Sequence, residues 1–152
     1  MSPPRRGHHV GSRDEMFVAL VDRVFEGVGD ASVKGPPTRR LRAMLERYCR
    51  RVVQHPNLVQ WVFANPTSIA GPLETLTQAL RDDLVALGLE GTERETRLGV
   101  LVDYTHGFAV SMAAYAEPDP SQPDALPPQT IDDYLRGLDW LLSAVSPCPR
   151  GR

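Results

Sequence analysis

The sequence predicts an all-α protein in which about six helices form a bundle. Apolar residues recur at spacings of three and four in separate stretches, as they do along one side of an amphipathic helix. Prolines and glycines separate these stretches, and none shows the strict alternation of a half-buried strand. At 152 residues the chain is long enough to form one domain around a single core.

The first predicted helix extends from Ser12 to Val28. Ser12 and Glu15 have the spacing of a capping box, in which the two side chains satisfy free amide groups of the first turn. Gly27 and Gly29 are expected to end the helix. Its apolar stripe consists of Met16, Phe17, Leu20, Val21, Val24, Phe25 and Val28.

A histidine-proline pair separates the second and third predicted helices. Pro56 lacks an amide donor and disfavours helical geometry in the residue before it, so the helix that begins at Thr38 is expected to end there. A short apolar helix over residues 58–64 follows. The arginines of the longer helix lie opposite its apolar side, and Glu46 stands four residues before Arg50, so we expect a solvated face with ion pairs.

Proline, glycine and a second capping box delimit the fourth and fifth predicted helices. Pro72 suits the first turn of the fourth helix, and Gly88 suits the cap that ends it. Thr92 and Glu95 form the capping box that opens the most apolar helix of the chain, over residues 92–116. Because its later turns carry little polar surface, we expect this helix to be buried on more than one side.

The last predicted helix extends from Thr130 to Val145, after a proline-rich loop at residues 117–129. Together with the helix before the loop, it carries more apolar surface than one helix contact requires. In a domain of this size such a surplus is either central core or a partner interface. Each glycine inside these helices costs about 1 kcal/mol against alanine, so a close helix crossing is expected near them. They are Gly99, Gly107 and Gly137.

Charge and cysteine usage argue against several classes of protein. The formal net charge of -2 argues against a dedicated nucleic-acid binder, which usually has an excess of lysine and arginine. The longest uncharged run, residues 104–116, is shorter than the roughly 20 residues that span a bilayer. Cys49 lies on an apolar helix side and Cys148 in the tail, so we expect no disulfide and a reducing compartment. The prediction is a cytoplasmic protein that does not enter the membrane.

Residues 8–28, HHVGSRDEMFVALVDRVFEGV, resemble a junction found in TetR-family transcriptional regulators. In that family the DNA-reading helix ends in an aromatic-x-His-Val or Phe motif, and a short turn leads into a long connecting helix. His9 and Val10 match the end of the motif, and Arg13 stands where a basic residue often contacts DNA phosphate. Gly7 departs from the pattern, because an aromatic residue is expected at that position.

From about His9 to Val145, the order of helices resembles the ligand domain of the family. The resemblance implies a transcriptional repressor, of which residues 12–146 are the effector-sensing and dimerisation domain. Residues 1–11 are then a disordered remnant of a DNA-binding head and residues 147–152 a flexible tail, and DNA contact is expected only if an N-terminal helix-turn-helix is restored. Two explanations stay open. Either an upstream start or a frame change separates the head from this chain, or the short form acts as a ligand sink or a dimer partner.

The resemblance further implies a mostly apolar cavity that binds a small, largely apolar effector. Large or polar-tipped residues on otherwise apolar helix sides are the candidates to line it. They are Tyr48, Cys49, Trp61, Phe63, Tyr104, His106, Phe108 and Met112. Core packing is the alternative for the aromatic residues and the methionine, and a hydrogen-bonded buried imidazole is the alternative for His106.

A homodimer is also implied, in which the last two helices pair with their copies as a four-helix bundle. The interface candidates are Val102, Gly107, Val110, Tyr134, Leu138, Leu141 and Leu142. The alternative for some of these residues is the core of a single chain.

No motif in the sequence points to an enzyme. The chain lacks a serine elbow, a glycine-rich phosphate loop and paired zinc histidines. Asp103 and His106 stand three residues apart, but no third ligand of recognisable spacing follows, so we expect no metal and no cofactor. The alternative to a regulator is a small all-helical enzyme or a ligand-sequestering protein that uses Tyr104 and His106 in a buried pocket.

Overall fold

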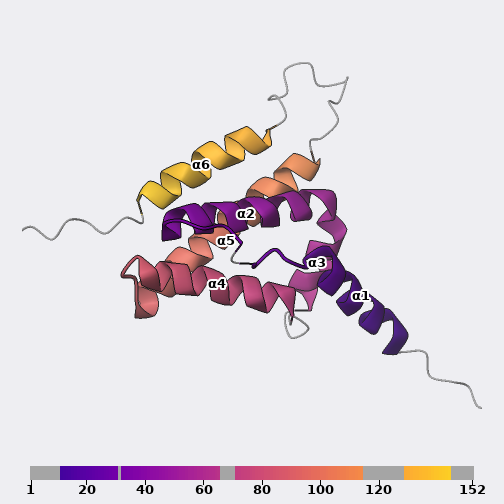
Figure 1. Cartoon of the computed structure of the whole chain (residues 1–152). Helices are drawn as coiled ribbons and strands as arrows, with labels where there is room; N and C mark the ends of the chain where they lie inside the picture. Colours follow the sequence, from indigo (N-terminus) through magenta and orange to yellow (C-terminus); the bar gives the residue numbers. More distant parts are fainter. Residues whose placement is uncertain (1–10, 31, 66–70, 115–128, 145–152) are drawn as a thin grey trace, which may run out of the picture.

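The computed structural model of the chain consists of six α-helices (Figure 1). They are α1 (Gly11–Val24), α2 (Pro37–Gln54), α3 (Pro56–Ala64), α4 (Pro72–Ala86), α5 (Gly91–Ala114) and α6 (Ile131–Ser143). The structure describes residues 11–30, 32–65, 71–114 and 129–144, and these segments contain no strand. The predicted all-α class is therefore confirmed. None of the described helices combines the length and the apolar character needed to cross a membrane.

Several predicted features lie outside the described residues. These are the remnant of a head before Gly11, nearly all of the proline-rich loop and the tail with Cys148. The last residues predicted for the fifth and sixth helices, 115–116 and 145, also fall there.

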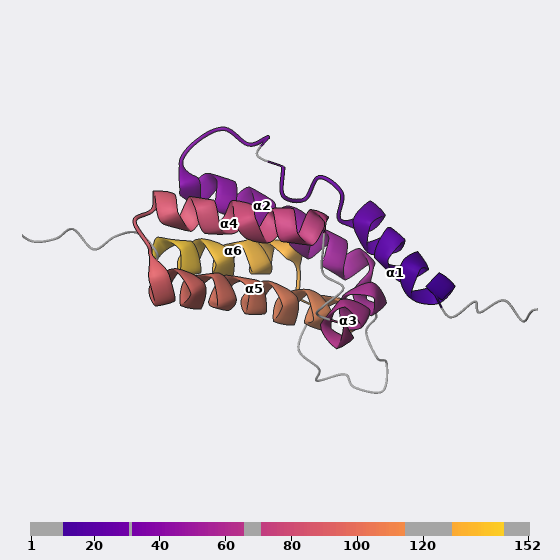
Figure 2. The same cartoon turned by 90° about the horizontal axis from the view of Figure 1, so that it is seen from below.

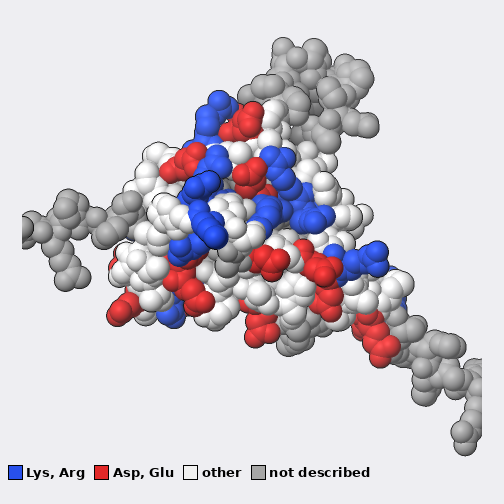
Figure 3. Space-filling view, in the orientation of Figure 1, with Lys and Arg blue, Asp and Glu red and all other residues white. Residues whose placement is uncertain are grey.

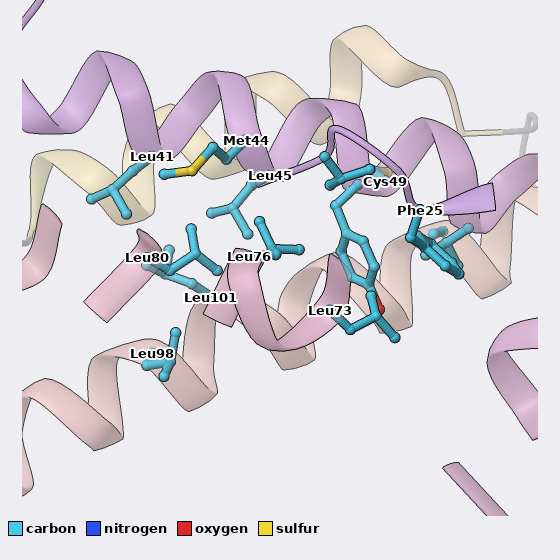
Figure 4. Close-up of a cluster of buried hydrophobic side chains, with 14 of the residues drawn as sticks. Phe25, Leu41, Met44, Leu45, Cys49, Leu73, Leu76, Leu80, Leu98 and Leu101 are labelled. Atoms are coloured by element: carbon cyan, nitrogen blue, oxygen red, sulfur yellow. The ribbon is translucent and has the colours of Figure 1, made fainter. Parts of the chain in front are cut away.

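The bundle is organised around α2, which contacts α3, α4, α5 and α6 (Figures 1 and 2). Its buried side meets leucines of α4 and α5 in one continuous cluster, part of which is drawn in Figure 4. The α2 members are Leu41, Met44, Leu45, Tyr48, Cys49 and Val52. Burial of one leucine side chain contributes roughly 1.5–3 kcal/mol, so this cluster is a main source of stability.

Proline and glycine set the helix boundaries as predicted. α2 ends before Pro56, which occupies the first turn of α3, and Pro72 occupies the first turn of α4. Gly88 follows α4 with a φ of 85°, which glycine adopts readily. The amide of Leu89 then donates to the carbonyl of Leu84 at 3.1 Å, which is one of the two bonds of a Schellman cap.

The caps of α5 and α6 differ from each other. Thr130 and Asp133 form a complete capping box at α6, in which the Asp133 amide donates to Thr130 Oγ1 and the Thr130 amide donates to the Asp133 carboxylate. The Glu95 carboxylate, expected to cap α5 with Thr92, instead accepts a hydrogen bond from Arg81 of α4 at 3.2 Å. The Glu95 carboxylate therefore forms an ion pair between two helices, although the sequence pattern predicts that it caps α5.

The first helix is shorter at its end than predicted. α1 begins at Gly11 and ends at Val24, and the chain then turns while Val28 remains buried. Gly29 packs against the backbone of α4, because a Cβ at this position would lie 2.7 Å from the amide nitrogen of Leu76. Gly29 was predicted to end the helix. In the structure it allows the turn after α1 to lie close to the backbone of α4.

Candidate functional site

One polar contact between helices of the bundle joins Tyr48 of α2 to His106 of α5. The Tyr48 hydroxyl lies 2.6 Å from His106 Nε2, within hydrogen-bond distance. Burial raises the pKa of Tyr48, whereas it lowers the pKa of His106 against an opposing effect of Asp103. Both side chains are therefore uncharged near neutral pH, and the imidazole tautomer determines which of the two atoms donates.

Aromatic rings surround this pair on two sides. Phe63 of α3 meets the His106 ring edge to face, with ring centres 4.6 Å apart and planes at 88°. Phe25, in the turn after α1, packs on Tyr48 at 5.5 Å. Phe63 is 53% exposed and His106 is half-buried, so the ring that packs on the imidazole is itself at the surface. We call Tyr48, Phe63 and His106 the histidine cluster.

The short helix α3 also contacts α1. Its Trp61 stacks on Phe17 of α1, with ring centres 5.0 Å apart and planes at 11°. The guanidinium of Arg13, the residue predicted to contact phosphate, lies 6.0 Å from the Phe17 ring centre on the exposed side of α1. One nine-residue helix therefore connects the histidine cluster to α1.

Two other predicted effector residues, Tyr104 and Phe108, belong to a second aromatic group between α5 and α6. Both pack against Tyr134, at 5.5 Å in each case. The Tyr104 hydroxyl donates to the Tyr134 carbonyl at 3.0 Å, and the Tyr134 hydroxyl lies 2.9 Å from Thr105 Oγ1. The polar tips of this group are thus bonded within the chain. The eight predicted residues therefore do not line one common site.

The remaining candidates have core or peripheral positions. Cys49 is fully buried, and burial raises the pKa of its thiol to about 12, so the thiol stays protonated and unreactive. Met112 is half-buried near the end of α5. Sequence reasoning did not assign Phe17, Phe25 or Thr105 to a site. The sequence placed Phe17 and Phe25 on the apolar stripe of the first helix. Such a stripe does not indicate which aromatic rings of other helices they contact.

A partly enclosed cleft of about 120 Å³ lies away from the histidine cluster. It is formed by α2, α4 and the segment before α2, and Asp82, Asp83 and Arg40 are among its lining residues. Arg40 forms an ion pair with the buried Asp83 at this place, with a guanidinium Nε to Oδ1 distance of 2.9 Å. None of the eight predicted effector residues lines this cleft. The cleft is therefore not the effector cavity that the sequence analysis predicts.

Basic and acidic side chains lie next to one another on the face shown in Figure 3, and several arginines of α2 form ion pairs. Arg42 and Arg50 both contact Glu46 within the helix, as the i, i+4 spacing predicts. Arg42 also binds Asp139 of α6 at 2.7 Å. The expectation of a solvated face with helix ion pairs is confirmed for these residues.

The predicted interface residues divide into buried and exposed groups. Tyr134, Leu138 and Leu142 lie in the core of the single chain and are at most 4% exposed. The prediction that these three residues form a dimer surface is therefore wrong for this structure. Their side chains instead hold α6 against its own bundle. Val102 and Leu141 are half-buried, whereas Gly107 and Val110 are exposed. The sequence-based list omits Val100 and Trp140, which are 46% and 71% exposed.

Neither the comparisons nor the side chains of the described residues identify a relative or a metal centre. No protein-family model, curated protein or solved structure matches the chain. Within the described segments, no three histidine, cysteine, aspartate or glutamate side chains are grouped to hold a metal ion. The histidine cluster and the exposed side of α5 and α6 are therefore the features from which a function can be inferred.

Proposed function

We propose that this chain is the effector-sensing and dimerisation domain of a TetR-like transcriptional regulator, which responds to a small, largely apolar molecule. The observation that carries the proposal is the double contact of α3. This helix presents Phe63 to His106 in the bundle and Trp61 to Phe17 on α1. In the family that the sequence resembles, the helix at the position of α1 connects the sensor to the DNA reader.

A molecule that approaches His106 from the side of α3 has to displace the Phe63 ring. α3 has only nine residues and is separated from α2 by the His55-Pro56 break, so it can shift as a unit. Trp61 then moves with it, and the stacked Phe17 transmits the shift to α1. An effector that binds the shifted state more tightly changes the populations of the two states, which is the coupling a regulator requires.

The chemistry of the histidine cluster favours an uncharged effector with one hydrogen-bonding group. Tyr48 and His106 are uncharged near neutral pH, and their other close neighbours are aromatic rings. An apolar surface with one polar contact recognises the orientation of a ligand through that contact and obtains affinity from ring packing. A phenol or a naphthol has this combination.

Support for a homodimer comes from α5 and α6. The exposed side of these helices carries Val100, Val110 and Trp140, which are large apolar residues at the surface. Gly107 stands among them on α5, and apart from its own stretch of helix no atom of the described residues lies within 4 Å of the place where its Cβ would be. No contact with another described segment explains this glycine, which costs about 1 kcal/mol in a helix. Gly99 is equally free of neighbours, so the argument for a second chain at Gly107 rests on the exposed apolar residues on the same side.

The test of effector sensing combines binding with a report from Trp61. The chain has two tryptophans, so fluorotryptophan labelling gives two ¹⁹F resonances, which a Trp61→Phe variant assigns. A panel of simple phenols and naphthols is screened for molecules that raise the melting temperature. We expect a hit to shift the Trp61 resonance, and Phe63→Ala to change the dissociation constant of the hit at least about 10-fold.

Val85→Ala is the matched control, because Val85 is 45% exposed on α4, away from the histidine cluster. It is expected to leave affinity unchanged. Binding that neither shifts the Trp61 resonance nor depends on Phe63 would contradict the proposed route to α1. Turnover of a hit would instead support the enzyme alternative.

A further inference from the structure

We infer that the cleft between α2 and α4 is a second binding site, for a short linear molecule with an ammonium group at one end and a carbonyl oxygen at the other. The cleft has a volume of about 120 Å³ and is lined by α2, α4 and the segment before α2. Since one water molecule takes roughly 30 Å³, this volume admits only a compact ligand. The inference goes beyond the proposed function, because neither the histidine cluster nor α3 contributes to this site.

Two arginines of α2 hold the segment before α2 in place beside the cleft. Arg47 donates to the backbone carbonyl of Asp30 at 2.7 Å and lies 3.0 Å from the Ser32 hydroxyl oxygen. Arg40, two turns earlier on α2, donates to the backbone carbonyl of Gly35 at 2.6 Å. Because both arginines also line the cleft, its walls are fixed by hydrogen bonds between separate segments of the chain.

The cleft has polar ends and an apolar middle. Arg40, Met44 and Arg47 stand at i, i+4 and i+7 on α2, so they form one stripe along the helix. The two arginines are about 10 Å apart along the helix axis, at 1.5 Å per residue. Met44 lies between them, and α4 adds Ala79 to the apolar lining. A linear ligand with a polar group at each end of an apolar chain matches this order.

Arg47 has a hydrogen-bond donor that is not used. Its two terminal guanidinium nitrogens bond to the segment before α2, whereas its Nε is buried and no described residue accepts the Nε hydrogen. Buried donors are nearly always paired in folded proteins, because an unpaired one loses its hydration without compensation. An acceptor at this end of the cleft therefore stabilises the folded chain, and we assign the ligand's carbonyl oxygen to it.

The other end of the cleft offers carboxylate oxygens. Asp83 is buried and accepts both hydrogen bonds from Arg40 through Oδ1, and no described residue donates to its Oδ2. Asp82 is exposed next to it and accepts a hydrogen bond from Gln78. With Asp30, the lining carries three carboxylates against two guanidinium groups, so it has an excess of one negative charge. This excess favours an ammonium group at the Asp82 and Asp83 end.

The test uses δ-aminovaleramide, in which an apolar chain joins an ammonium group to an amide carbonyl. Valeramide lacks the ammonium group and pentylamine lacks the carbonyl, so these two compounds are matched controls. NMR titration of the ¹⁵N-labelled full chain follows the backbone amides of the cleft and the Nε–H resonance of Arg47, which Arg47→Lys assigns. We expect δ-aminovaleramide to bind with a dissociation constant below about 1 mM and to shift the Nε–H resonance. Each control compound should bind at least about 10-fold more weakly.

Two variants test the position of the site. Ala79→Leu places a larger side chain in the cleft and should raise the dissociation constant at least about 10-fold, whereas Ala86→Leu, at an exposed residue of the same helix, should leave it within about 2-fold. Asp82→Asn removes one carboxylate and should raise it about 5-fold, with Glu15→Gln, exposed on α1, as the control. Circular dichroism verifies folding, and Asp82→Asn decides the question if Ala79→Leu does not fold.

Three results would overturn the inference. Equal binding of pentylamine, or an Nε–H resonance of Arg47 that does not move, would exclude the assigned carbonyl contact. Equal binding of valeramide would exclude the ammonium contact. No saturable shift up to about 10 mM δ-aminovaleramide would show that the cleft holds water only. None of these results bears on the histidine cluster, which the Trp61 resonance tests separately.

Discussion

Replacing Gly29 by alanine tests the close approach between the turn after α1 and helix α4. The added Cβ would lie 2.7 Å from Leu76 N, 2.8 Å from Leu76 Cα and 3.0 Å from Thr75 C. All three atoms are backbone, so no side-chain rotation relieves the overlap. Gly29 has no left-handed φ, and alanine adopts its backbone without strain. The substitution therefore perturbs this contact alone.

The magnitude follows from the overlap. Ordinary contact begins at 3.4 Å, so the turn has to withdraw by about 0.7 Å from α4. Overpacking of this kind costs about 1–3 kcal/mol. For a chain of this length, each kcal/mol lowers the melting temperature by roughly 2–4 °C, which gives a decrease of about 2–12 °C.

Chemical denaturation with urea, followed by circular dichroism, measures the free energy of unfolding. Gly99→Ala is the control, because Gly99 lies within α5 and nothing is found within 4 Å of its Cβ position. It should stabilise the chain by about 0.5–1 kcal/mol through helix propensity. If Gly29→Ala left the stability unchanged or raised it, the proposed packing of this turn on Leu76 would be refuted.

Two further predictions concern His106 and the cap of α6. Burial lowers the pKa of His106 from its ordinary 6.5, so the unfolded chain binds the proton more readily; stability is complete above that value and decreases as the pH falls below it. Urea titrations between pH 7.5 and 5 should show this decrease, and His106→Gln should flatten it, whereas an equal slope in the variant would assign the effect elsewhere. Thr130→Ala should cost about 0.5–2 kcal/mol by removing the capping box with Asp133. Gln129→Ala, at the exposed residue before the cap, serves as control in the same denaturation assay, and equal stability of the two variants would argue against the cap.

Local sequence signals determined most of the helix boundaries. Pro56 and Pro72 cannot donate an amide hydrogen bond inside a helix, and Gly88 adopts a left-handed φ without cost. These properties do not depend on distant residues, so they set helix boundaries that the sequence alone predicts. The capping box of Thr130 could likewise be read from the sequence, because its partner lies three residues away. The same pattern failed at Thr92, where a distant arginine competes for the carboxylate.

The orientation of the apolar helices could not be read in the same way. α5 carries apolar residues around much of its circumference, so periodicity did not distinguish the buried Leu101 and Ala109 from the exposed Val100 and Val110. On α6 the sequence indicated one apolar stripe that includes Tyr134, but not whether this stripe packs on its own chain or on a second copy. In the structure Tyr134 is buried in its own chain, where it closes an aromatic group.

The sequence by itself therefore determined an all-helical chain, its breaks and the residues from which a site could be built. Only the tertiary structure decided that Phe63 meets His106, that Trp61 meets Phe17 and that Trp140 faces outward. The physical reason is range. Caps and breaks depend on neighbours within a few residues, whereas ring contacts and exposure depend on how separate helices pack together.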